Sequence, residues 1–197
     1  MTVTIIRLFN DYAVASQVVR DLEAAGLRHS DLSIVASNSG DWFSKTTKKT
    51  VVDSKYDHNR DGVDDRAQGA EMGAGLGAVA GGAVGLLAGI GLIAIPGLGP
   101  VVAAGWLAAT AAGAAAVGVA GGIIGALTEA GVSEEHAAIY AESVRRGGAI
   151  VTARVPDHEL SRYEMILDGT AVNIEERQLA YHQSGWKGFD DAAPPHI

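Results

Sequence analysis

Hydrophobic and polar residues alternate at the start of the chain in a pattern that predicts a β-α-β unit. Val3, Ile5 and the run from Ile6 to Phe9 are rich in residues that favour a strand. The following run, YAVASQVVRDLEAAG, repeats its apolar side chains at helical spacing, with Asn10 or Asp11 as a cap and Gly26 at its end. DLSIVAS (31–37) alternates again and predicts the second strand.

The other end of the chain repeats this plan. Ser133 can cap the helix EEHAAIYAESVRR, whose acidic start and basic end suit the helix dipole, and Gly147 with Gly148 ends it. AIVTARV, HELSRYEMILDG and AVNIEER then predict a strand, a helix opened by Pro156, and a last strand. Two β-α-β units predict an α+β, ferredoxin-like fold with a four-stranded antiparallel sheet and helices on one face. The helix 133–146 is predicted to pack beside that sheet.

The centre of the chain carries no charged side chain between Glu71 and Glu129. Glycines recur there every fourth residue, which predicts one helix face where small residues let two backbones approach closely. The predicted packing glycines are Gly69, Gly73, Gly77, Gly81, Gly85, Gly89, Gly105, Gly113, Gly121 and Gly125. The predicted turn between two helices is formed by Pro96, Gly97, Gly99 and Pro100. The centre is therefore predicted to be a long glycine-rich apolar helical hairpin, with arms at 70–95 and 100–128, inserted between the two β-α-β halves.

The apolar hairpin needs a partner that hides it from water. Glycine costs about 1 kcal/mol relative to alanine inside a solvated helix, and each arm is longer than the roughly 20 residues that cross a bilayer core. Three arrangements would bury it: a membrane hairpin that returns to the side it entered from, a soluble homo-oligomer that buries hairpins against each other, and a hairpin folded on its own sheet. Basic residues on both sides of the hairpin fit a cytoplasmic membrane face in the first arrangement.

The composition of the chain excludes several classes of ligand and site. The 197 residues carry a net charge of −8, which argues against nucleic acid as a ligand because phosphate contact needs a basic surface. The absence of cysteine excludes disulfides, thiolate metal sites and cysteine nucleophiles. The start, MTVTIIRLFNDY, lacks the longer apolar core of a secretory signal. We therefore expect the chain at the cytoplasmic side of the membrane, or in the cytoplasm as a soluble assembly.

The stretch DHNRDGVDDRAQ is the candidate metal site, and calcium is its candidate ion. Oxygen ligands stand at alternate positions, and Gly62 permits the sharp turn of a calcium loop. The predicted ligands are Asp57, Asn59, Asp61, the Val63 carbonyl and Asp65. Gln68 stands where such loops carry a bidentate acid, and Asp64 where they carry an apolar residue. The alternative is a polar linker whose Asp64 or Asp65 caps the first hairpin arm.

No residues form a recognisable catalytic or cofactor-binding pattern. The six histidines are scattered without metal-ligand spacing. Glycine-rich pieces such as GAGLGAVAGG contain nucleotide-loop spacings, but they lie inside an apolar helix pattern without a preceding strand or a following lysine. No serine stands in a nucleophile-turn context. The sequence therefore predicts a protein that is not an enzyme.

The order of the predicted elements resembles that of the bacterial general stress protein (heat-induced stress protein) domain family. The resemblance extends over residues 2–176, and its most specific parts are AIPGLGPVVAAG (94–105) and the helix end RRGGAIV (145–151). It implies stress-associated expression and a glycine-zipper insert, and it supplies no catalytic residues.

We divide the chain into a first β-α-β half (1–40), a polar linker with the candidate calcium loop (41–68), the glycine-zipper hairpin (69–130), a helix with the second β-α-β half (131–177), and a C-terminal tail (178–197). The predicted function is a non-enzymatic stress-associated protein that uses its hairpin for membrane association or homo-oligomerisation. The alternative is a soluble homo-oligomeric scaffold or binding module, calcium-responsive, with the hairpin buried in the assembly.

The tail has two interpretations of its own. It is either a flexible terminus or a segment that docks through aromatic side chains on a neighbouring subunit or at a membrane interface. The aromatic side chains in question are Tyr181, Trp186 and Phe189. Because aromatics are unusual in a purely disordered tail, docking is the favoured interpretation.

Overall fold

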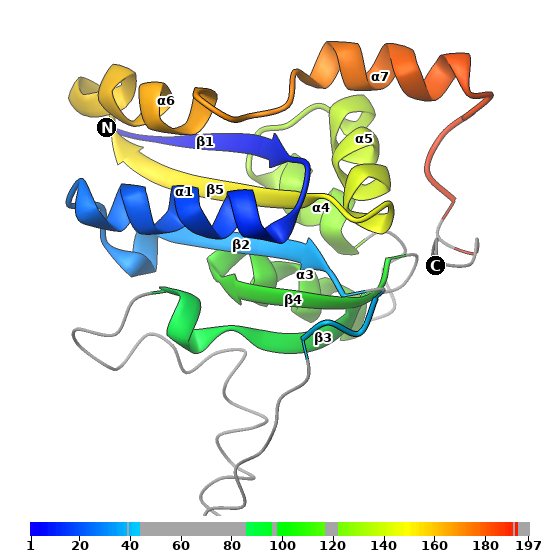
Figure 1. The fold of residues 1–197 in the computed structure, drawn as a ribbon, viewed down its shortest axis with the longest axis horizontal. Coiled ribbons are helices and arrows are strands. Elements are labelled where there is room, and N and C mark those ends of the chain that lie inside the picture. The colour runs from blue at the N-terminus through cyan, green and yellow to red at the C-terminus, as the bar shows by residue number, and fades with distance from the viewer. Residues whose placement is uncertain (39, 44–85, 96–97, 117–121, 191, 193–197) are drawn as a thin grey trace, which may run out of the picture.

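The computed structural model describes residues 1–38, 40–43, 86–95, 98–116, 122–190 and 192, which form an α+β fold. Their antiparallel sheet has five strands in the order β1-β5-β2-β4-β3 (Figure 1). The strands are β1 (Thr2–Phe9), β2 (Leu32–Ser37), β3 (Gly91–Ile95), β4 (Gly99–Gly105) and β5 (Ala149–Pro156). The α-helices are α1 (Tyr12–Ala24), α3 (Trp106–Ala116), α4 (Gly122–Glu129), α5 (Glu134–Arg145), α6 (Leu160–Asp168) and α7 (Ile174–Gln183). The short 3-10 helices are η1 (His29–Asp31), η3 (Leu86–Gly89) and η4 (Asp157–Glu159).

The first predicted β-α-β unit is confirmed, and so are the caps of two helices. The Asp11 carboxylate accepts a hydrogen bond from the Val14 N–H at 2.9 Å and starts α1. The Ser133 hydroxyl accepts one from the His136 N–H at 3.3 Å and starts α5. β1 and β2 are not neighbours, because β5 lies between them and pairs antiparallel with both. The chain therefore crosses over β5 through α1.

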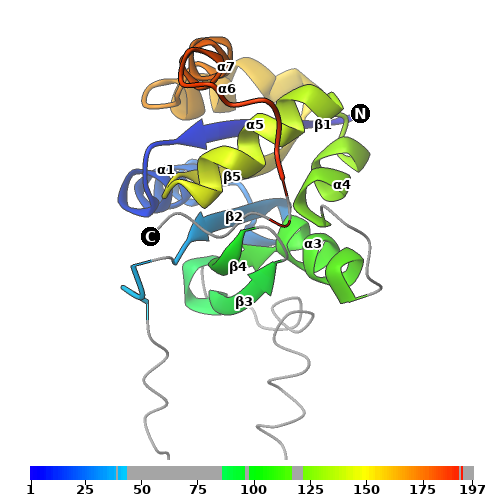
Figure 2. The same cartoon turned by 90° about the vertical axis from the view of Figure 1, so that its right-hand side faces the viewer.

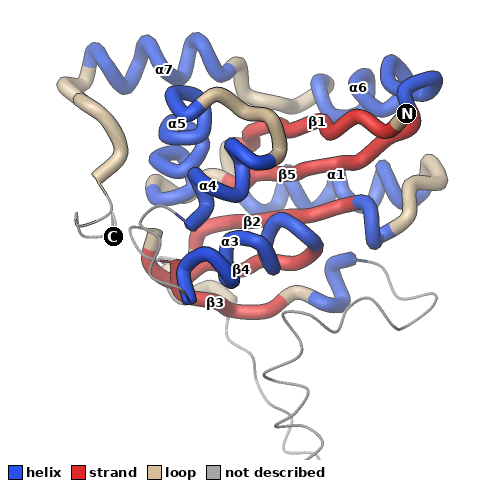
Figure 3. Tube along the Cα trace, turned by 180° about the vertical axis from the view of Figure 1, so that it is seen from behind, coloured by secondary structure: helices blue, strands red, loops and turns tan. Residues whose placement is uncertain are grey.

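Helices cover both faces of the sheet, whereas the sequence predicted one covered face. In Figure 1, α1 and α6 lie on the near face, and α3, α4 and α5 lie on the far face, as Figures 2 and 3 show from other sides. The two hydrophobic clusters follow this division: Ile34 and Val102 belong to the cluster under α1, and Val35 and Val101 to the cluster under α3. Because both faces are covered, every residue of β2 is buried.

The predicted last strand, AVNIEER, is wrong except for one residue. Val172 makes an isolated antiparallel bridge with Leu8 of β1, and the chain then begins α7 at Ile174. The reason is a strong helix start: the Asn173 side chain accepts a hydrogen bond from the Glu176 N–H at 3.0 Å. The ferredoxin-like four-stranded arrangement is therefore replaced by a five-stranded sheet with β4 and β3 added beside β2.

The predicted helical hairpin is wrong at its turn and on both sides of it, whereas α3 and α4 confirm helix in part of the second arm, 100–128. Both sides of the predicted turn are strands, β3 and β4, which pair antiparallel. The chain still reverses there, and the Leu98 N–H donates to the Ile95 carbonyl at 3.0 Å. Pro96 and Gly97 lie outside the described residues, whereas Gly99 and Pro100 begin β4. Apolar residues buried between two helical layers satisfy a strand as well as a helix, and pairing with β2 favours the strand.

The predicted packing glycines do not form a helix-helix contact within the described residues. Gly89 lies in η3, and Gly105 ends β4 opposite Ser33. Gly113 of α3 and Gly125 of α4 are exposed, with open space where a Cβ would lie. The others lie outside the described residues: Gly69, Gly73, Gly77, Gly81, Gly85 and Gly121.

The apolar centre is hidden on the chain's own sheet, as far as it is described. β3 and β4 extend the sheet, and α3 and α4 pack over its far face, which corresponds to the third burial arrangement considered above. Among the helices that the structure describes, none combines the length and the apolar character that a bilayer crossing requires.

Candidate interaction sites

Other parts of the chain close the outer edge of β1. The Ile6 carbonyl accepts hydrogen bonds from the Tyr140 hydroxyl at 3.2 Å and from Arg7 Nη1 at 3.1 Å. The Leu8 carbonyl accepts one from the Val172 N–H at 2.7 Å. Edge carbonyls without such partners are a template for pairing with another strand, so these bonds protect β1 from that outcome.

A charged pair ties β1 to α6 beside the same edge. Arg7 Nε donates to the Asp168 carboxylate at 2.5 Å, and Glu164 lies 4.0 Å from Arg7. The hydrogen bond with Asp168 raises the pKa of Arg7, against the opposing effect of burial. Burial raises the pKa of Tyr140, which keeps its hydroxyl protonated as the donor to β1.

The opposite edge of the sheet, β3, has no such cover in the part of the chain that the structure describes. Its recorded strand partner there is β4, with Gly91 opposite Ala103 and Ile95 opposite Gly99. Leu92 is 45% exposed. No charged residue or proline interrupts β3, although natural edge strands commonly carry one of these to prevent pairing with other chains. β3 is therefore a candidate interaction strand.

Apolar side chains lie on the near face around the β3 edge. Leu92 lies opposite Val102, a member of the cluster under α1, so Leu92 points to the same face. Just after β2, Trp42 is 47% exposed and stacks on Tyr12, with ring centroids 4.6 Å apart. The Trp42 indole N–H donates to the Ser37 carbonyl at 2.9 Å, which fixes the ring beside the end of β2. Among the described residues, a strand edge without a partner and exposed apolar side chains thus occur on one side of the molecule.

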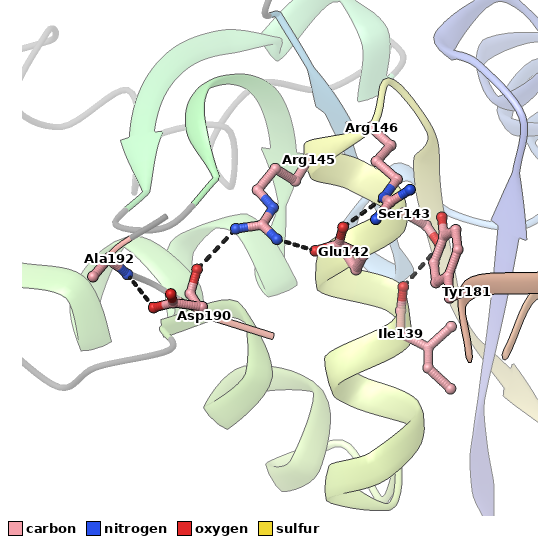
Figure 4. Close-up of polar contacts among 8 residues, drawn as sticks. All are labelled: Ile139, Glu142, Ser143, Arg145, Arg146, Tyr181, Asp190 and Ala192. Atoms are coloured by element: carbon pink, nitrogen blue, oxygen red, sulfur yellow. Dashed lines mark hydrogen bonds and ion pairs between the residues drawn. The ribbon is translucent and has the colours of Figure 1, made fainter. Parts of the chain in front are cut away.

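A second candidate site is a group of charges at the C-terminal end of α5, two of them buried and one exposed (Figure 4). Glu142 is 0% exposed and accepts hydrogen bonds from Arg145 Nη2 and Arg146 Nε. Arg145 is itself only 5% exposed. A buried carboxylate is tolerated here because two guanidinium groups pair with it, and cations are favoured at a helix C-terminus. We call Glu142, Arg145 and Arg146 the α5 ion cluster.

The C-terminal segment packs on the α5 ion cluster. Arg145 Nη1 donates to the Asp190 carbonyl at 2.8 Å, and the Phe189 ring centroid lies 5.0 Å from the Arg145 guanidinium carbon (Figure 4 shows the Asp190 bond). Tyr181 of α7 is buried, with its hydroxyl 3.0 Å from Ser143 Oγ. In the described residues these aromatic side chains therefore pack on their own chain, and docking on a neighbouring subunit or a membrane interface stays a prediction.

The predicted calcium loop lies outside the described residues, which include none of Asp57, Asn59, Asp61, Val63 and Asp65. Within the described part of the chain, no group of three or more His, Cys, Asp or Glu side chains is placed to hold a metal ion. Calcium binding at the loop stays a prediction from the sequence.

A hollow of about 330 Å³ opens at the end of the sheet where β5 ends and β2 begins. Arg28 and Asp31 on its wall pair with each other at 2.8 Å. Arg154, also on its wall, stacks over the Trp106 ring at 3.8 Å from the centroid. The residues that line the hollow include no serine, cysteine or histidine, and these three charged side chains are engaged as described. We assign no chemistry to it.

Sequence reasoning missed both candidate sites, although each has a local signal. The apolar run LIAI between Gly91 and Pro96 has the length of a short buried strand, a signal that the glycine period concealed. The spacing of Glu142 to Arg145 and Arg146 predicts ion pairs on one face of α5. Nothing in that spacing predicts the burial of Glu142 and Arg145, which depends on how the rest of the chain folds over them.

Comparison of this chain with family models, with curated proteins and with solved structures finds no match. The two candidate sites, with the motif resemblance described above, are therefore the basis for assigning a function.

Proposed function

We propose that the protein is a non-enzymatic, stress-associated scaffold that self-associates through the edge strand β3. The observation that carries the proposal is the β3 edge itself, an uncharged strand with an exposed leucine and no recorded cover among the described residues. The stress association rests on the resemblance alone. Its most specific residues fall in the β3–β4 hairpin and at the junction of α5 with β5.

Charge favours a second copy of the chain as the partner. The chain has a net charge of −8, yet no charged residue lies between Glu71 and Glu129, the stretch that contains β3, β4 and α3. Two copies that approach through β3 keep their acidic surfaces apart. A strongly acidic or basic partner would find no complementary charge on this strand.

The sequence of β3 also suits pairing with itself. Two antiparallel copies can be related by a two-fold axis at Ile93, so that Leu92 of one copy lies opposite Ala94 of the other. Leu92 and Ala94 are both exposed, and opposite residues share a face of the sheet, so a large and a small side chain would meet. The sheet would then continue from one copy into the next.

The test is the mass of the full-length protein in solution, measured by size exclusion with light scattering. The wild-type chain is expected as a dimer or larger, and Leu92→Lys as a monomer, because a lysine on an edge strand keeps its charge in water and opposes pairing. Leu179→Lys is the matched control: Leu179 is 61% exposed but lies on α7, so its replacement should leave the assembly intact. A wild-type monomer at high concentration would refute the proposal.

The same samples test the other two expectations from the sequence. Flotation with lipid vesicles that resists carbonate would place the glycine-rich segment in a bilayer, and membrane association would then replace β3 pairing as the main function. A mass that changes on adding calcium and returns with a chelator would make the assembly calcium-responsive.

A further inference from the structure

The C-terminal segment 186–190 lies against the end of α5 like a bound peptide. After the turn that ends α7, the segment runs beside α5 and α4 (dark red in Figure 2). The Trp186 N–H donates to the Tyr181 carbonyl at 3.0 Å, and the two rings are 5.8 Å apart. Beyond Trp186, the segment is held by Phe189 and by the Asp190 carbonyl.

Arg145 supplies the recognition chemistry for this segment. Arg145 Nη2 donates to the Glu142 carboxylate, and Arg145 Nη1 donates to the Asp190 carbonyl. The guanidinium also lies over the Phe189 ring. A buried guanidinium needs acceptors, and Arg145 Nε has none among the described residues. Removal of the segment would leave Nη1 without its acceptor as well. The site therefore demands a ligand that presents a carbonyl oxygen next to an aromatic ring, which an extended peptide does.

Most residues of the segment are exposed, and its attachment depends on two half-buried aromatic side chains and one hydrogen bond to Arg145. Lys187, Gly188 and Asp190 are exposed, and Phe189 is half-buried. Gly188 has a φ of +141°, and Gly185 at the turn has a φ of +85°, conformations that glycine adopts freely. Among the described residues, Asp190 also accepts a hydrogen bond at its carboxylate from the Ala192 N–H at 2.9 Å, within the segment's own neighbourhood. Opening of the segment therefore costs the Arg145 bond and the packing of Phe189 on the far-face cluster, which is less than global unfolding costs.

We propose that Arg145, positioned by Glu142 at the end of α5, is a binding site for an extended peptide segment with an aromatic side chain, and that residues 186–190 of a second copy can occupy it in exchange for the chain's own. The two occupants are chemically identical, so the site cannot distinguish them except through the effective concentration of the tethered one. Exchange of an identical element between protomers is a low-cost route to dimers. This contact is separate from β3 pairing, since α5 covers the far face and β3 is an edge.

The first experiment measures peptide binding by fluorescence anisotropy. The probe is a labelled, amidated peptide of residues 184–190, SGWKGFD, whose amide preserves the carbonyl that Arg145 binds. The receptors are the full-length wild-type chain and full-length Phe189→Ala, in which the chain's own segment is weakened. Phe189→Ala is expected to bind about tenfold more tightly, because the wild-type site is occupied most of the time by its own segment.

The controls distinguish a loss of peptide binding at the site from a loss of folding. The peptide SGWKGAD should bind neither receptor, and it cannot misfold. In the Phe189→Ala background, Arg145→Lys should abolish binding, whereas Arg146→Lys should retain it, because Arg146 pairs with Glu142 but contacts Tyr181 and not the segment. Equal affinity of both receptors, equal affinity of both peptides, or no binding by a Phe189→Ala chain with a wild-type melting curve would each overturn the proposal.

The second experiment tests exchange between whole chains. Full-length Phe189→Ala has an intact site and a weakened segment, and full-length Arg145→Lys has a weakened site and an intact segment. Leu92→Lys is added to both, so that β3 pairing does not contribute. Light scattering should find a two-chain complex in the mixture and not in either sample alone. Absence of that complex at concentrations above the measured peptide Kd would overturn exchange between copies, whatever the outcome for β3.

Discussion

The two edge strands of the sheet, β1 and β3, differ in whether their outward backbone groups have partners among the described residues. At β1, outward carbonyls are engaged by Tyr140, Arg7 and the Val172 N–H, and the Arg7–Asp168 pair adds charge beside them. At β3, the described residues supply neither a donor nor a charge. Because an edge is a template for another strand, the difference suggests that β1 is built to end the sheet and β3 to continue it.

The largest expected effect on stability comes from replacing Gly105, which lies at the end of β4 opposite Ser33 of β2. Gly105 ends β4 with a φ of +91°, and an added Cβ would lie 2.7 Å from Ser33 Cα and closer still to the Leu32 carbonyl oxygen. Gly105→Ala is therefore expected to lower the free energy of unfolding by about 3–4 kcal/mol. Urea unfolding measures the loss, and hydrogen exchange should speed up in β4 and β2 before β1.

Gly26→Ala is the matched control for that prediction. Gly26 has a similar φ of +100°, but nothing lies within 4 Å of the added Cβ. Only the left-handed backbone is penalised, so a loss of about 1–2 kcal/mol is expected. Equal losses for the two variants would mean that backbone strain, and not contact with β2, is the reason for glycine at Gly105.

A smaller effect is expected at the covered edge, with a characteristic pH dependence. Tyr140→Phe removes the hydroxyl that donates to the Ile6 carbonyl, and a loss of about 1 kcal/mol is expected at neutral pH because Arg7 still donates there. Burial raises the pKa of Tyr140 in the folded chain. Above about pH 10 the unfolded chain therefore releases this proton first, and stability falls as pH rises toward the folded pKa.

The measurement is urea unfolding of both chains at pH 8 and at alkaline pH. The wild-type chain should lose more stability across this range than Tyr140→Phe does, so the difference between the two chains should shrink. Burial also raises the pKa of Tyr12, which is present in both chains, so its contribution cancels in the comparison. A difference that stays constant or grows with pH would contradict the assignment of the hydroxyl as a buried, protonated donor.

The flanks of the fold could be predicted because their signals are local. Asp11 and Ser133 cap their helices as the sequence predicts, and the strands beside them alternate clearly. The centre could not, because glycine and alanine at helical spacing contain no information about which distant strand they meet. Ala103 and Ala104 are poor strand formers by themselves, and their pairing with β2 between two helical layers decides their conformation.

The candidate sites divide in the same way. The ion pairs of α5 could be predicted from the spacing of Glu142, Arg145 and Arg146, whereas the cover provided by Phe189 and Asp190 depends on a fold that brings the C-terminus back to α5. The openness of β3 depends on the strand order, since a five-residue apolar strand in the middle of the sheet would offer no edge at all.

The smallest expected effect tests whether the charge of Arg7 or the hydrogen bonds to its edge carbonyls protect β1 from pairing with another chain. The side chains of Arg7 and Asp168 are 30% and 51% exposed, so their coupling in a double-mutant cycle of Arg7→Met and Asp168→Asn should be only about 0.5 kcal/mol. If hydrogen bonds to the edge are the main protection, Arg7→Met combined with Leu92→Lys stays monomeric, because Tyr140 and Val172 still engage the Ile6 and Leu8 carbonyls. A dimer of this double variant would show that the arginine charge keeps β1 unpaired, and the contrast between the two edges would then be one of charge alone.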